Sequence, residues 1–140
     1  MGIGWVLIAA AMQAGQPGES TVDIDLTGLR SQRGTLHVCL TRKPANFPDC
    51  KSDPGAIRSS AAAATHRLHL DHVPAGRYAI AVFHDENSNR NLDKFAGIPK
   101  EGFAFSRNPS IKFRAPRFEE VAIDLMPGGN QARLKMHYLL

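Results

Sequence analysis

The sequence predicts an all-β protein, an antiparallel β-sandwich of the prealbumin-like or Ig-like kind with about seven strands. Beyond about residue 20, apolar residues recur with a period of two in several short segments, the pattern of strands with one buried face. Breaker residues such as Gly, Pro, Asn and Ser separate these segments. The apolar period of a helix is essentially absent over the same region. An open barrel is the alternative architecture.

Each expected strand follows from its own pattern. Val22, Ile24 and Leu26 alternate with polar residues, and Leu36, Val38 and Leu40 repeat the alternation. The segment "GRYAIAVFH" is apolar on both faces, which is typical of a strand covered on both sides. The Ala run at 61–64 is expected to form at most one helical turn. Strands are expected over residues 21–29, 34–41, 65–73, 76–84, 120–126 and 131–140.

The N-terminal segment "MGIGWVLIAAAMQA" is uncharged and apolar from Ile3 to Met12. Such a stretch is shorter than the roughly 20 residues that span a bilayer, but it suits a secretory signal peptide with Ala11 or Ala14 before the cleavage point. We expect a signal peptide over residues 1–14, or to residue 20 with the linker "GQPGES". Residues 21–140 then form one β-sandwich domain, periplasmic or secreted, with no transmembrane anchor. A disordered or docked apolar N-terminus is the alternative.

Cys39 and Cys50 are the two cysteines of the chain. Zinc sites usually take four ligands, and this spacing without a second pair matches none of the common frameworks. In an exported protein we expect one disulfide that closes the loop "CLTRKPANFPDC" and contributes on the order of 3 kcal/mol through chain entropy. Two free thiols are the alternative if the protein is not exported.

The charge pattern argues against nucleic-acid binding. Lys and Arg number 17 against 13 Asp and Glu, for a formal charge of +4. The basic residues are scattered from Arg30 to Lys135 rather than gathered in one run. A nucleic-acid-binding protein concentrates its basic residues on one face or segment, so we expect an ordinary mixed surface.

The stretch "HDENSNRNLD", residues 84–93, resembles a calcium-binding loop. Calcium takes six to eight oxygen ligands, which loops supply from alternating acid and amide side chains. Candidate ligands stand at alternate positions: Asp85, Asn87, Asn89, Asn91 and Asp93. The match is incomplete, because Arg90 replaces the turn glycine and Ala96 replaces the final glutamate. One interpretation is therefore a structural calcium site, whose incomplete ligand set predicts a weak affinity of about 10⁻⁴ to 10⁻³ M.

An ion-free loop is the alternative interpretation of the same residues. Asn and Asp side chains bond to backbone groups a few residues along the chain and tolerate left-handed conformations. Calcium is the one cofactor that the sequence suggests.

The segment "VPAGRYAIAVFHDENSNRNLDKFAGIPKEGFAFSRNP" resembles the small exported bacterial proteins of the domain of unknown function 2141 family. The resemblance extends to "GTLHVCL", "FPDC" and "MHYLL". In that family the loop usually reads Asp-Glu-Asn-Gly-Asn-Gly, and this chain has Ser88 and Arg90 at the glycine places. The resemblance implies export and a β-sandwich, and it implies no activity.

The most specific part of the resemblance is "GIPKEGFAFS", whose role in the family is unknown. Its characteristic residues are Gly97, Pro99, Glu101, Gly102 and Phe103. The segment is either a ligand-facing loop with Lys100, Glu101 and Arg107 exposed, or a connection over one end of the sandwich whose phenylalanines enter the core. We favour the second.

The sequence contains no motif of a known catalytic class. Ser106 lies in no G-x-S-x-G turn, and there is no phosphate-binding glycine loop before a helix. Histidines at 66, 69 and 72 alternate in direction on a strand, so they cannot converge on one metal.

We expect a non-catalytic module of the cell envelope that binds an unidentified envelope protein or a small ligand. A hydrolase or other enzyme built on exposed loops, and a small-ligand carrier with a groove between the sheets, are the alternatives.

Overall fold

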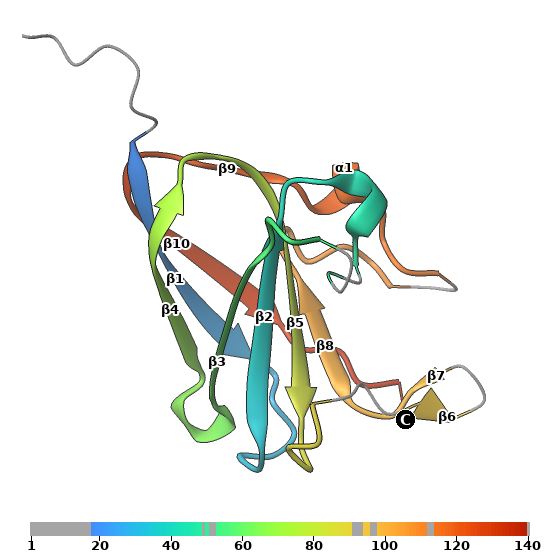
Figure 1. Cartoon of the computed structure of the whole chain (residues 1–140). Coiled ribbons are helices and arrows are strands. Elements are labelled where there is room, and N and C mark those ends of the chain that lie inside the picture. Colours follow the sequence, from blue (N-terminus) through green and yellow to red (C-terminus); the bar gives the residue numbers. More distant parts are fainter. Residues whose placement is uncertain are drawn as a thin grey trace, which may run out of the picture.

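The computed structural model describes residues 18–48, 50, 53–90, 94–95, 98–111 and 114–139. These residues form a mostly-β protein, as predicted (Figure 1). The strands are β1 (Glu19–Thr27), β2 (Thr35–Thr41), β3 (Ile57–Ala62), β4 (Arg67–Pro74), β5 (Gly76–Asp85), β6 (Lys94–Phe95), β7 (Ile98–Pro99), β8 (Gly102–Phe105), β9 (Ile123–Leu125) and β10 (Gly128–Lys135). Short helical turns are Pro44–Asn46, Ala63–Thr65 and α1 (Phe118–Val121).

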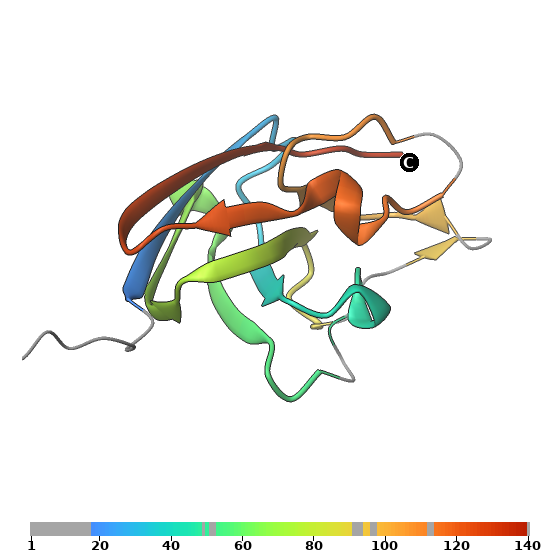
Figure 2. The same ribbon diagram turned by 90° about the horizontal axis from the view of Figure 1, so that it is seen from above.

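Two sheets make the sandwich. One has the strand order β10-β1-β4, and the other has the order β3-β2-β5-β8 with β9 paired to the start of β5 (Figures 1 and 2). All pairs are antiparallel except β1 with β10, which run parallel from Ser20 opposite Gly128 to Thr27 opposite Lys135. β6 and β7 form a separate small hairpin. The predicted β-sandwich is thus confirmed, with one mixed sheet.

The core lies between the sheets and follows the predicted alternation. On β1, Val22 and Ile24 are fully buried while Asp23 and Asp25 face outward. β2 buries Leu36, Val38 and Leu40 in the same way, and its other residues point to the opposite face of the sheet. The core is completed by Leu68, Leu70, Val73, Tyr78, Ile80, Val82, Ala104, Leu125, Leu134 and Met136, among others.

β5 is covered on both faces, as its sequence predicts. Its second face packs into a smaller aromatic cluster with α1 and the segment around Phe47. That cluster contains Ala79, Phe103, Phe105, Phe118, Val121 and Ala122. Because β5 lies between two apolar layers, the polar residues at its C-terminal end are held on a rigid strand.

Four segments differ from the sequence-based expectation. The strand expected over residues 131–140 is β10, which begins at Gly128 and ends at Lys135. Residues 58–65 were expected to connect strands, but β3 runs through them, because small half-buried side chains such as Ser59 and Ala61 give no apolar alternation. "GFAF" was expected in a connection and forms β8. The strand expected over 120–126 begins only at Ile123, because the Glu120 carboxylate accepts a hydrogen bond from the Arg117 amide and caps α1 instead.

The predicted signal peptide over residues 1–14 lies outside the described residues. Within the described part of the chain, no helix has the length and apolar character needed to cross a membrane.

Candidate functional site at the Asp85 end of the sandwich

One end of the sandwich gathers polar side chains from loops that are distant in the sequence. The β1–β2 loop, the turn after β5 and the turn before β8 meet there, at the lower end of Figure 1. Two open pockets lie on this end. The first, about 230 Å³, is lined by Thr35, His37, Ser60, Asp85, Ser88 and Arg90. The second, about 270 Å³, is lined by Arg30, Arg33, Glu86, Asn87, Lys100 and Glu101.

Asp85, the last residue of β5, is fully buried and carries the turn that follows it. Its Oδ1 accepts a hydrogen bond from the Asn89 amide at 3.1 Å, and its Oδ2 accepts one from the Arg90 amide at 2.7 Å. The His37 ring adds a third contact, with Nε2 3.0 Å from Oδ2. A buried carboxylate needs such partners, because desolvation without them costs several kcal/mol.

His37 bridges Asp85 to a serine on the neighbouring strand. Its Nδ1 lies 2.8 Å from Ser60 Oγ. Because the Asp85 carboxylate can only accept, the ring hydrogen belongs on Nε2, and Nδ1 accepts the Ser60 hydroxyl hydrogen. His37 pairs directly with Ser60 on one side and with Phe83 on the other, and its ring stacks on Phe83 with centroids 4.6 Å apart. Strand register and stacking together fix the imidazole.

Ser88 and Arg90, the residues at the family's glycine places, have left-handed backbones. Their φ angles are 53° and 65°. This conformation costs a residue with a Cβ roughly 1–2 kcal/mol, which explains why glycine suits both places. Both side chains line the His37 pocket, and Ser88 Oγ lies 3.1 Å from Thr35 Oγ1. Backbone strain kept at a pocket is an indication of function.

Glu86 anchors the second pocket through Arg30. Its Oε1 accepts from Arg30 Nε at 2.8 Å, and its Oε2 accepts from Ser31 Oγ at 3.1 Å. Burial by itself raises the pKa of Glu86, but the hydrogen bonds from Arg30 and Ser31 and the nearby positive charges outweigh it, so the pKa lies below its ordinary value. Arg33 Nη2 lies 3.6 Å from Glu86 Oε2, and the Arg33 side chain is 79% exposed.

His84 ties the β1–β2 loop and the C-terminal segment to β5. It is fully buried, and its Nε2 donates to the Arg33 carbonyl at 2.6 Å. Gly34, with φ 78°, packs so closely on the backbone of Asp85 and Glu86 that a Cβ there would overlap it. The loop that carries Arg30 and Arg33 is therefore fixed against the end of β5.

The predicted calcium ligands divide into two groups. Asp85, Asn87 and Asn89 are described, whereas Asn91 and Asp93 lie outside the described residues. Asn87 Oδ1 accepts a hydrogen bond from the Asn89 amide at 3.3 Å, so this part of the loop has the Asx pattern of the ion-free alternative. Among the described residues no group of three or more His, Cys, Asp or Glu could hold a metal. Calcium binding stays a prediction.

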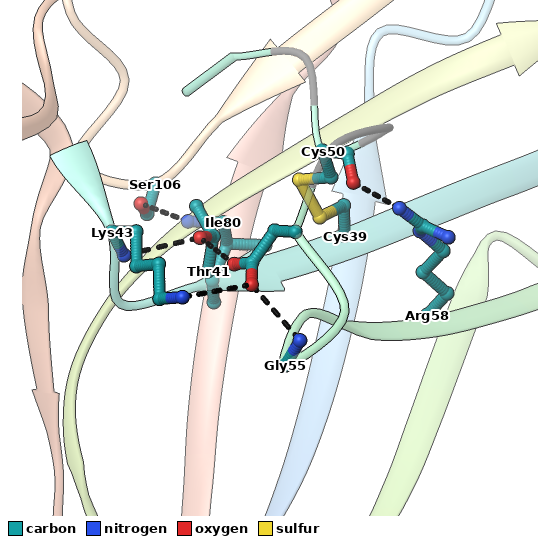
Figure 3. The surroundings of a disulfide bond; sticks show 9 residues. Cys39, Thr41, Lys43, Cys50, Gly55, Arg58, Ile80 and Ser106 are labelled. Carbon is teal, nitrogen blue, oxygen red and sulfur yellow. Dashed lines mark hydrogen bonds and ion pairs between the residues drawn. A yellow bond between two sulfur atoms is a disulfide. The ribbon is translucent and has the colours of Figure 1, made fainter. Parts of the chain in front are cut away.

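Cys39 and Cys50 are joined by a disulfide, as predicted (Figure 3). The bond fastens the loop after β2 to the outward face of that strand. Further contacts hold the same region: Thr41 Oγ1 donates to the buried Asp53 carboxylate at 2.6 Å, and the Arg58 guanidinium donates to the Cys50 carbonyl.

In its described part, the family-like segment contributes to the core and also lines the second pocket through Lys100 and Glu101. Phe103 is buried on β8, as in the favoured interpretation, and Glu101 is buried rather than exposed. A Cβ on Gly102 would overlap the ring of Tyr138, which packs on this strand. Pro99 lies in β7, and Gly97 lies outside the described residues.

Sequence reasoning missed His37 and Ser60 because it missed β3. The outward position of His37 was readable from the alternation of β2, but its partner became visible only with the pairing of β2 and β3. No local motif marks Ser60, because it sits in mid-strand rather than in a sharp turn.

A protein-family model matches residues 24–133, from within β1 to within β10, so the match contains both sheets and the Asp85 end. No curated protein and no solved structure matches the chain. The matching family is described as "Uncharacterized protein conserved in bacteria (DUF2141)". The match confirms the resemblance found in the sequence, and the chain belongs to this family.

Proposed function

We propose that the protein is an exported module of the bacterial cell envelope, working in the periplasm or outside the cell, that binds a small anionic ligand at the Asp85 end. The main support for the proposed export is the Cys39–Cys50 disulfide, because such bonds persist in oxidising compartments. The apolar segment over residues 1–14 supports it, since its length suits a signal peptide.

The ligand class follows from the second pocket. Arg30, Arg33 and Lys100 line it together with two carboxylates, of which Glu86 is engaged by Arg30. Guanidinium groups match carboxylate and phosphate geometry with paired hydrogen bonds. A volume of about 270 Å³ suits a small molecule rather than a polymer or a lipid chain.

Export is tested by expressing the full chain in a bacterium, separating periplasm from cytoplasm, and measuring the intact mass and free thiols. We expect a periplasmic product cleaved after Ala11 or Ala14, with both cysteines blocked. An uncleaved cytoplasmic product with free thiols would contradict the export.

Ligand binding is tested by backbone NMR titration with acetate and inorganic phosphate. Chemical-shift changes are expected around the second pocket, and Arg33→Gln should weaken them several-fold. Arg133→Gln is the matched control, because Arg133 is exposed on β10 of the other sheet. If both variants weaken binding equally, the anions respond to the overall surface charge and the second pocket is not their site.

A further inference from the structure

We propose that Ser60, His37 and Asp85 form a nucleophilic centre that accepts the acyl group of small polar esters. This goes beyond the binding role above and departs from the sequence-based expectation of a module without catalysis. The three side chains come from β3, β2 and β5, which are neighbours in the five-stranded sheet (Figure 1). They form an unbroken chain, with 2.8 Å from Ser60 Oγ to His37 Nδ1 and 3.0 Å from His37 Nε2 to Asp85 Oδ2.

The hydrogen bonds run in the direction that nucleophile activation needs. Ser60 donates to an imidazole nitrogen whose opposite N–H points at a carboxylate. This is the order of roles in Ser-His-Asp catalysis, with the two ring nitrogens exchanged. His37 can therefore take the hydroxyl proton as the serine oxygen attacks, and Asp85 stabilises the imidazolium that results.

Groups other than Ser60, His37 and Asp85 hold these three side chains in place. Phe83 stacks on the imidazole, and the sheet register places Ser60 directly opposite His37. The Asn89 and Arg90 amides hold the Asp85 carboxylate in one orientation. A catalytic group held in place before the substrate arrives lowers the entropic part of the barrier.

The pocket around the serine sets the substrate class. Ser60 is exposed, and the pocket of about 230 Å³ opens to solvent, so a short acyl group fits while its alcohol part extends outward. Thr35, Ser88 and Arg90 line the wall with hydroxyl and guanidinium donors. Such donors stabilise the negative charge that develops on a carbonyl oxygen under attack. The substrate class is therefore a short-chain acyl ester of a polar alcohol.

The reaction balances with water as the co-reactant. Ser60 Oγ bonds to the ester carbonyl carbon while its proton passes to His37 Nδ1. The tetrahedral intermediate then breaks the bond to the alcohol oxygen, which leaves with the proton from His37, and an acyl-serine remains. Water next gives a proton to His37 and attacks the acyl carbon. The carboxylic acid departs as Ser60 Oγ regains the proton.

Backbone strain beside the serine is a second, independent observation. Ser88 and Arg90 keep left-handed conformations that glycine adopts at lower cost, and both side chains line this pocket. From these positions both side chains can reach a substrate bound in the pocket.

The first experiment treats the oxidised full chain with a fluorophosphonate probe and locates the adduct by mass spectrometry. We expect one adduct, on Ser60, and none after His37→Gln. Ser59→Ala is the matched control, because Ser59 is the preceding residue of β3 and points to the other face. The Ser59→Ala variant should react with the probe to the same extent as the wild-type protein. Labelling spread over several residues, or unchanged labelling of the Ser60→Ala chain, would overturn the proposal.

The second experiment measures hydrolysis of p-nitrophenyl acetate by the same chains. Ser60→Ala should lower kcat/KM about 100-fold or more while its unfolding midpoint stays within a degree, since Ser60 is exposed. Asp85 is a positioning residue, and Asp85→Asn should lower kcat and leave KM unchanged in samples that circular dichroism shows to be folded. Hydrolysis by Ser60→Ala at the rate of the unchanged chain would refute the assignment.

Discussion

The hydroxyl of Tyr138 lies 2.9 Å from Nδ1 of the fully buried His84. Since His84 Nε2 donates to a carbonyl, Nδ1 accepts the tyrosine hydrogen. The same hydroxyl accepts the Arg30 amide at 3.2 Å, and the Arg30 guanidinium lies 4.5 Å above the tyrosine ring. One side chain near the C-terminus therefore joins the β1–β2 loop to β5 and supports the whole Asp85 end.

Tyr138→Phe is expected to lower the free energy of unfolding by about 1–2 kcal/mol, because it leaves a buried imidazole nitrogen without its donor. Urea unfolding followed by circular dichroism measures the change. Leu139→Ala is the control, since Leu139 is the exposed neighbour. A midpoint of Tyr138→Phe equal to that of the control would show that the hydroxyl contributes nothing.

Arg90→Gly is expected to raise the free energy of unfolding by about 1 kcal/mol, because glycine adopts the φ of 65° without the Cβ clash. Arg90→Ala keeps the clash and should bring no gain. If the pocket acts on esters, the same glycine variant should also hydrolyse p-nitrophenyl acetate more slowly. If the glycine variant is no more stable than the alanine variant, the left-handed backbone at Arg90 is not strained.

If the 84–93 loop binds calcium with the predicted affinity of about 10⁻⁴ to 10⁻³ M, 5 mM calcium should raise the free energy of unfolding by about 1–2 kcal/mol and the unfolding midpoint by several degrees. Asp85 could serve as a ligand only by giving up part of its hydrogen bonding, because it is fully buried and its oxygens already accept three hydrogen bonds. Thermal unfolding in EDTA and then in calcium tests this, because binding only to the folded state must raise stability. A rise that Asp93→Ala abolishes would establish the calcium loop, and an unchanged midpoint would establish the ion-free turn.

The outer face of β1 and β4 is expected to stabilise the protein more at acidic than at basic pH. His69 Nδ1 lies 2.5 Å from Asp23 Oδ1, and Nε2 lies 2.7 Å from Asp71 Oδ1. The hydrogen bonds to Asp23 and Asp71 raise the pKa of His69 above its ordinary value of 6.5. A raised histidine pKa contributes stability that is fully present below the unfolded pKa and is lost as pH rises through the folded pKa.

His69→Gln should therefore cost more stability at about pH 5.5 than at about pH 9, in urea unfolding at both values. NMR titration of the ring should give a pKa above 6.5 that falls in Asp23→Asn. An unshifted His69, or a cost independent of pH, would show that solvent screens these exposed pairs.

Removal of the disulfide by the double change Cys39→Ser and Cys50→Ser is expected to lower the free energy of unfolding by about 3 kcal/mol. The bond closes a loop with a sequence separation of 11, and its loss returns that loop's freedom to the unfolded chain. Urea unfolding of the double variant, with the reduced unchanged chain for comparison, measures the loss. Equal stability of oxidised and reduced chains would contradict it.

The local part of the fold could be predicted wherever neighbouring residues carry the signal. Val22, Ile24 and Leu26 alternate with acids, and such alternation is a property of consecutive residues. The two cysteines, together with the expected export, likewise predicted a disulfide that closes a short loop. β3 was not predicted, because Ser59 and Ala61 are too small to form an apolar period. α1 was not predicted either, because it is a single turn whose signal is one capping glutamate.

By itself, the sequence determined the fold class, the buried face of the main strands, the disulfide and the family. Only the tertiary structure decided which residues meet at the Asp85 end. The parallel pairing of β1 with β10 and the contact of His37 with Ser60 and Asp85 depend on register between strands far apart in the chain. Register is set by the packing of the whole core, so no local pattern contains it.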